Sequence, residues 1–196
     1  MSTNEAIRQF LQQPVNLATA YDVRDWLKDA ERHIFETFWS GVRERLEAKL
    51  TQLRCGDNWQ VVVSASLFEG DGSFLSIAPL GIARAELSTD QQCYSVTAQQ
   101  FGAESGSCYF GIFRGARRHD ALDISLKADG FRSNGHWSGY RYFKALNLPD
   151  FCLNRDNILR LNADNRSSDR LVASAVANQM LVLFEKHHVL LRELNA

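Results

Sequence analysis

The chain has 196 residues, of which 45% are hydrophobic and 23% are charged, and its formal net charge is −1. These values suit one globular domain and exclude an intrinsically disordered chain, which would carry fewer apolar groups and more net charge. No apolar run approaches the roughly 20 residues that span a bilayer, and the first residues, MSTNE, lack the pattern of a secretory signal. We therefore expect one cytoplasmic domain over residues 1–196, with residues 1–19 as an N-terminal helical arm and no membrane contact.

Two helices are predicted at the start of the chain. The first covers residues 4–13 and ends at Pro14, whose ring and missing N–H cannot continue the hydrogen-bond ladder. From Asp22 to Arg54, apolar residues recur every three or four positions, which predicts a long helix with one buried stripe. The stripe comprises Val23, Trp26, Leu27, Ala30, Ile34, Phe38, Val42, Leu46, Leu50 and Leu53. Asp22 is a candidate N-cap, and Gly41 indicates a bend or a close contact within the helix.

After Trp59 the apolar pattern becomes that of strands. Runs rich in β-branched and aromatic residues predict strands at residues 61–67, 74–82, 93–98 and 107–113. Short glycine-containing turns are expected between the first and second strands, at residues 70–73, and between the third and fourth, at residues 102–106. Such connections predict an antiparallel meander of four strands, or slightly more, with one face covered by the long helix.

The last part of the chain contains two further predicted helices. Residues 120–129 fit either a helix or a strand, and we favour the helix because Leu122 and Leu126 lie four residues apart. Ser168 or Asp169 is predicted to cap a final helix that runs to about Leu194. The predicted fold class is therefore α+β, with the meander sheet packed against a long N-terminal helix and a C-terminal helix.

No residue pattern typical of catalysis or metal binding is recognisable. The four cysteines contain no CxxC pair, and no predicted strand carries the acid-x-Lys tripeptide of metal-dependent nucleases. Arg114 and His119 have the Arg-x4-His spacing of certain metal-independent ribonucleases, but Arg114 ends a strand instead of lying in a helical bundle. We expect no catalytic residue, metal or cofactor, and keep an unrecognised enzyme using Arg114, His119 and His136 as an alternative.

Charge is distributed unevenly along the chain. Residues 1–110 carry nine basic and fourteen acidic groups, whereas residues 111–170 carry eleven basic and seven acidic groups. The basic stretch contains several aromatic residues, so it could bind a phosphate backbone or an acidic protein, or it could be an ordinary solvated surface over packed rings. The residues predicted to bind nucleic acid or a partner are Arg114, Arg117, Arg118, Arg132, Trp137 and Arg141.

Three short motifs occur in a recognisable order. They are Phe38-Trp39-x-x-Val42-Arg-Glu-Arg-Leu46, Tyr109-Phe110-Gly111-Ile112 and His136-Trp137-x-x-Tyr140-x-Tyr142-Phe143. Together with the closing helix they resemble, over residues 20–192, the C-terminal region that follows the nuclease core in one group of PD-(D/E)XK-like bacterial proteins. The catalytic residues of that family lie in the core, which has no counterpart before residue 20, so none is carried over. The resemblance implies an accessory or recognition module that works alone or beside a partner.

These observations support two classes of binding protein. The leading hypothesis is a non-catalytic recognition or accessory protein that binds a partner protein, or nucleic acid, in a bacterial or phage defence or counter-defence system. The alternative is an antitoxin, immunity protein or inhibitor whose acidic helix covers a basic active site. The acidic residues in question are Asp22, Asp25, Asp29, Glu36 and Glu44.

Overall fold

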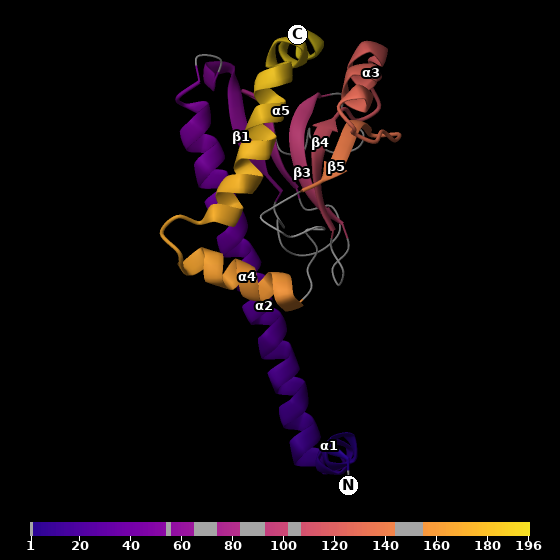
Figure 1. The fold of residues 1–196 in the computed structure, drawn as a ribbon, viewed down its shortest axis with the longest axis vertical. Coiled ribbons are helices and arrows are strands. Elements are labelled where there is room, and N and C mark those ends of the chain that lie inside the picture. The colour runs from indigo at the N-terminus through magenta and orange to yellow at the C-terminus, as the bar shows by residue number, and fades with distance from the viewer. Residues whose placement is uncertain (1, 54–55, 65–73, 83–92, 102–106, 144–154) are drawn as a thin grey trace.

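The computed structural model describes residues 2–53, 56–64, 74–82, 93–101, 107–143 and 155–196 (Figure 1). The helices are α1 (Thr3–Leu11), α2 (Pro14–Leu50), the 3-10 turn η1 (Gly56–Asn58), α3 (Asp120–Ala128), α4 (Arg155–Arg166) and α5 (Leu171–Asn195). The strands are β1 (Trp59–Val63), β2 (Phe74–Pro79), β3 (Ser95–Phe101), β4 (Ser107–Phe113) and β5 (Trp137–Tyr142). The turns predicted at residues 70–73 and 102–106 lie outside the described residues.

The strands form one antiparallel sheet in the order β1-β2-β3-β4-β5, so each strand pairs with its neighbour in the sequence. The predicted α+β class and meander are confirmed. The fifth strand comes from the aromatic segment after Gly135, and a register shift between Ile112 and Phe113 marks a bulge where it pairs with β4. Residues 120–128 are helical, as favoured above, with the His119 ring nitrogen accepting a hydrogen bond from the Leu122 N–H at 3.2 Å.

One face of the sheet forms the main core with α5 and the second half of α2. Alternate strand residues such as Ile77, Val96 and Phe110 point to this side and are fully buried. They meet Phe38 of α2 and Phe184 of α5, which are also fully buried. Helix α3 covers the β5 end of the same face, since a side chain at Gly139 would come within 3 Å of Leu126 and Phe131.

Helix α2 differs from its prediction in two ways. It begins at Pro14, not at Asp22, because proline at the first helical position needs no N–H partner. The apolar stripe is also not one buried face, since burial in α2 begins only at Phe35. The reason is tertiary: α4, α5 and the sheet contact α2 only from about Ile34 onward, so the apolar residues before it have no core to pack against.

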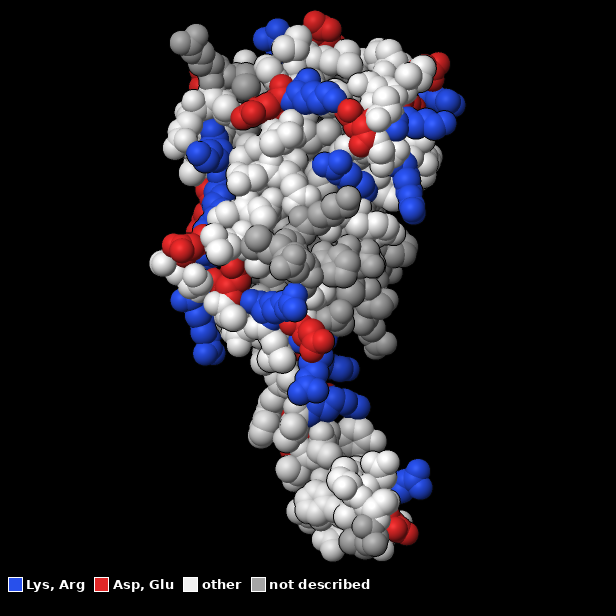
Figure 2. All heavy atoms as spheres, in the orientation of Figure 1, with Lys and Arg blue, Asp and Glu red and all other residues white. Residues whose placement is uncertain are grey.

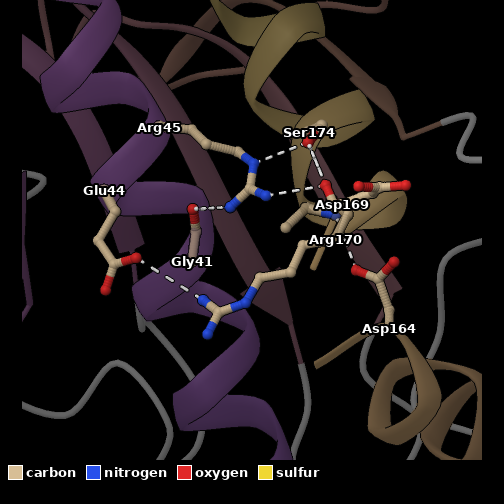
Figure 3. A network of polar contacts seen from close by, with 8 residues as sticks. Gly41, Glu44, Arg45, Asp164, Asp169, Arg170 and Ser174 are labelled. Carbon is tan, nitrogen blue, oxygen red and sulfur yellow. Dashed lines mark hydrogen bonds and ion pairs between the residues drawn. The ribbon is translucent and has the colours of Figure 1, made fainter. Parts of the chain in front are cut away.

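Polar contacts hold the C-terminal part of α2 to the junction of α4 and α5 (Figure 3). The Arg45 guanidinium donates to the Ser174 hydroxyl at 2.7 Å, to the Asp169 carbonyl at 3.0 Å and to the Gly41 carbonyl at 3.1 Å. Gly41 indeed marks a close contact, because a β-carbon there would lie 2.9 Å from the guanidinium of Arg170. That guanidinium also forms a 3.6 Å ion pair with Glu44.

The cap of α5 was predicted wrongly. Arg170 occupies the N-cap position with left-handed backbone angles and gives no side-chain cap. The Asp164 carboxylate of α4 instead accepts hydrogen bonds from the N–H groups of Val172 at 3.0 Å and Ala173 at 3.2 Å. The capping group thus comes from the preceding helix. A prediction that considers only Ser or Asp directly before the helix cannot identify it.

Because His187 of α5 is buried, we expect the stability of the protein to depend on pH. The His187 side chain is buried and its Nε2 has no hydrogen-bond partner among the described residues. Burial and the charge of Lys186 lower the pKa of His187, against an opposing effect of Asp129. The unfolded chain therefore binds the proton more readily, so stability should fall as pH drops below the unfolded value of about 6.5.

Urea unfolding between about pH 8 and about pH 5 tests this expectation. Wild type should lose more unfolding free energy over that range than His187→Leu, which carries no titrating group at this position. The control is the same replacement at exposed His136. Equal pH slopes for wild type and His187→Leu would contradict the prediction.

Candidate functional site

The N-terminal arm, defined here as residues 3–33, projects from the body of the protein (Figure 1). It consists of α1 and the first part of α2, and none of its residues is buried. At an axial rise of about 1.5 Å per residue, residues 14–33 alone extend about 30 Å. Helix α4 crosses α2 at the base of the arm, where the Asn165 amide donates to the Ile34 carbonyl at 2.8 Å.

The arm exposes an unusual amount of apolar surface. Large apolar side chains that are at least 40% exposed in this stretch are Ile7, Phe10, Val15, Leu17, Tyr21, Val23, Trp26 and Leu27. They are eight of the fifteen such residues in the described part of the chain, although the arm is only a small fraction of it. Trp26 is 68% exposed, whereas Trp39, Trp59 and Trp137 are at most 6% exposed. Exposed apolar surface of this extent on one projecting element is typical of a binding site.

The six residues predicted to bind are not all presented to solvent. Arg114 is 7% exposed, and its guanidinium donates to the carbonyls of Arg117 at 2.7 Å and Asn134 at 2.9 Å. It thereby joins the turn after β4 to the loop before β5. Trp137 is 3% exposed and contacts the rings of Tyr109 and Phe113. Burial raises the pKa of Tyr109 to about 12, so its hydroxyl stays protonated well above neutral pH.

The other four arginines are exposed, and each of them also contacts another residue of the fold. Arg117 donates to the Leu194 carbonyl at 2.7 Å, and Arg118 forms an ion pair with Asp120 at 3.0 Å. The backbone of Arg132 pairs with Tyr140. The Arg141 guanidinium lies 4.4 Å from the Phe131 ring centre. On the face drawn in Figure 2, Lys and Arg lie among Asp and Glu instead of forming one basic surface. Nucleic-acid binding through these residues stays a prediction.

The candidate enzyme residues are not assembled into a recognisable site. His119 caps α3, the Arg114 guanidinium binds backbone carbonyls, and His136 is exposed. Within the described ranges, no group of three or more His, Cys, Asp or Glu side chains is placed to hold a metal ion. None of the helices that the structure describes is long and apolar enough to cross a membrane.

An open recess of about 560 Å³ lies beside the contacts of Figure 3. Its lining residues are Glu44, Arg45, Asn165, Arg166, Ser167, Ser168 and Arg170. Two of its three arginines are already engaged, because the nitrogens of Arg45 donate to protein oxygens and Arg170 is paired with Glu44. These groups act in holding α2 to the α4–α5 junction.

Sequence reasoning missed the arm as a surface because it assigned Val23, Trp26, Leu27 and Ala30 to the buried stripe. Spacing could not reveal their exposure, since Leu27 lies only about 20° around the helix from Phe38, yet Leu27 is exposed and Phe38 is buried. Comparison with protein-family models, with curated proteins and with solved structures finds no match, so the arm and its surroundings define the candidate site by their own geometry.

Proposed function

We propose that this protein is a non-catalytic recognition or accessory protein that binds a partner protein through its N-terminal arm. The observation that carries the proposal is the exposure of eight large apolar side chains on α1 and the first half of α2. Exposed apolar surface costs about 25 cal/mol per Å² relative to buried surface, and a partner that covers it recovers this free energy. On the resemblance described above, the proposed setting is a bacterial or phage defence or counter-defence system.

Charge favours a protein over nucleic acid as the partner of the arm. Residues 3–33 carry five acidic and four basic side chains, so this helical arm lacks the basic excess that binds a phosphate backbone. A basic protein surface is attracted to the same helix. The exposed carboxylates of Asp22, Asp25 and Asp29 therefore also support the second candidate function, an inhibitor or immunity protein that covers a basic active site.

A photo-crosslinking amino acid at position 26 tests where the partner binds. In cells of the source organism it should capture a protein that the same residue at position 182 does not, since Val182 is similarly exposed, at 65%, but lies on α5. The captured protein is then purified and its affinity for the full chain is measured by calorimetry.

The double variant Trp26→Ala/Leu27→Ala should weaken that binding at least about tenfold, because exposed aromatic anchors carry much of an interface's free energy. The matched control Val182→Ala/Val189→Ala removes exposed apolar groups from α5 and should bind like wild type. Both variants should unfold at the wild-type temperature because all four side chains are exposed. Unchanged affinity of the Trp26/Leu27 variant would show that the arm is not the binding element.

A further inference from the structure

Four residues of α2 within the arm have the spacing of a helix-pairing seam. Thr19, Val23, Trp26 and Ala30 follow one another at intervals of four, three and four residues, which keeps them in a stripe on one side of a helix. Leu27 is next to Val23 and Trp26 on this stripe and is 57% exposed. The stripe therefore has the form of one half of a two-helix contact whose second helix is absent from the described chain.

The two edges of the stripe differ in chemistry. Asp22 and Asp29 are spaced seven residues apart and follow one edge, whereas Ala20 and Leu27 follow the other. At about 100° per residue, the basic residues of the arm lie on the opposite side of the helix. Arg32 reaches Asp29 from that side at 3.5 Å, and both side chains are at least half exposed, so this pair contributes little free energy.

We propose that the stripe binds an amphipathic helix of a partner protein, and that this helix carries Lys or Arg along the edge that faces Asp22 and Asp29. The inference rests on the proposed function and adds the chemistry of the partner. A basic edge satisfies the acidic row by ion pairs across the seam, while the apolar side chains of the partner cover Val23, Trp26 and Leu27.

The same charges disfavour a second copy of this chain as the occupant. In an antiparallel pair of arms the acidic edges face each other, and like charges repel. In a parallel pair each acidic edge faces the apolar edge of the other arm, which removes water from the carboxylates without supplying a partner charge. An anionic lipid surface is disfavoured as well, because helices that bind it carry basic polar faces.

The fluorescence of Trp26 provides a direct measure of occupancy. Since the other three tryptophans are buried, acrylamide quenches Trp26 preferentially in the full-length protein. The probes are two synthetic helical peptides, each three heptads long and free of aromatic residues. Both have Leu at the seam positions, and one has Lys and the other Glu at the flanking positions. Binding of a peptide is measured as protection of Trp26 from quenching. The affinity of the Lys peptide should be at least about tenfold higher than that of the Glu peptide.

Charge reversal at two aspartates provides a matched comparison. Asp29 lies on the acidic edge and Asp25 on the back of the helix, yet both are exposed and each is paired with a neighbouring arginine, at 3.5 Å and 2.9 Å. Asp29→Lys should weaken binding of the Lys peptide about fivefold, whereas Asp25→Lys, which changes net charge equally, should change it less than about twofold.

Each other outcome contradicts the proposal in a different way. Equal affinities for the two peptides, or no protection by the Lys peptide, show that the acidic edge does not select a basic helix. A sedimentation shift to a dimer that is lost in Trp26→Ala/Leu27→Ala identifies a second copy as the occupant. Protection by anionic vesicles and not by the Lys peptide identifies a membrane surface. If crosslinking captures a partner at position 26 while the peptides fail, the proposed function stands and this inference fails.

Discussion

Replacing Phe110 by alanine is expected to lower the free energy of unfolding by about 3–5 kcal/mol. Phe110 on β4 is fully buried and stacks on Phe143, with ring centres 4.5 Å apart. The Phe131 ring meets it edge-on at 5.9 Å, and the Arg141 guanidinium lies 5.2 Å from its centre. Alanine removes these contacts and leaves a cavity that the surrounding sheet and helices cannot fill, because backbone elements hold its walls.

The loss should appear as a lower urea midpoint with an unchanged slope, and as a melting temperature lowered by roughly 10 °C. Phe10→Ala is the control, since the same side chain is removed from a position that is 59% exposed. That variant should stay within about 0.5 kcal/mol of wild type. A loss below about 1 kcal/mol for Phe110→Ala would contradict the packing described here.

Replacing Asp164 by alanine should destabilise the protein by about 2–3 kcal/mol. The Asp164 carboxylate is only 9% exposed and accepts hydrogen bonds from two N–H groups of the first turn of α5. Arg170, at the N-cap position, gives no side-chain hydrogen bond that could replace it. Alanine would therefore leave two buried donors without acceptors, and the interaction of the carboxylate with the helix dipole would also be lost.

Two further variants separate the cap from general effects on α4. Asp164→Asn keeps one oxygen as an acceptor and should lose about half as much free energy. Asp156→Ala removes an exposed carboxylate from the first turn of α4 and should cost less than about 1 kcal/mol. The free energy of unfolding of all three variants is measured by chemical denaturation. If Asp164→Ala lowers it no more than Asp156→Ala does, the proposed cap is excluded.

The sequence alone predicted the elements whose signals are local. Alternating apolar residues and short connections predicted the order of the strands from β1 to β4, and the leucine spacing in residues 120–129 favoured the helix that became α3. The C-terminal helix was predicted to within a few residues at each end. Strand β5 was not predicted, because its glycine-rich surroundings resemble a loop until β4 supplies hydrogen-bond partners.

The candidate site depended on information that no local pattern contains. Val23 and Trp26 have the same kind of spacing as Phe38 and Val42, so periodicity predicts an apolar face for both halves of α2 without indicating which half is covered. Coverage is decided by where α4, α5 and the sheet lie, and they contact α2 only from about Ile34 onward. The Asp164 cap also depends on tertiary structure. Asp164 and Val172 are eight residues apart in the chain, and only the turn between α4 and α5 brings them together.

Sequence thus indicated the segments of this protein that become helices and strands, apart from α4 and β5, because backbone propensity and apolar periodicity act over a few residues. Tertiary structure decided which apolar faces are buried and which polar groups meet, because burial depends on contacts between segments distant in the chain. The arm is a candidate binding surface for this reason. It carries large apolar side chains, but none of its residues is buried by the rest of the protein.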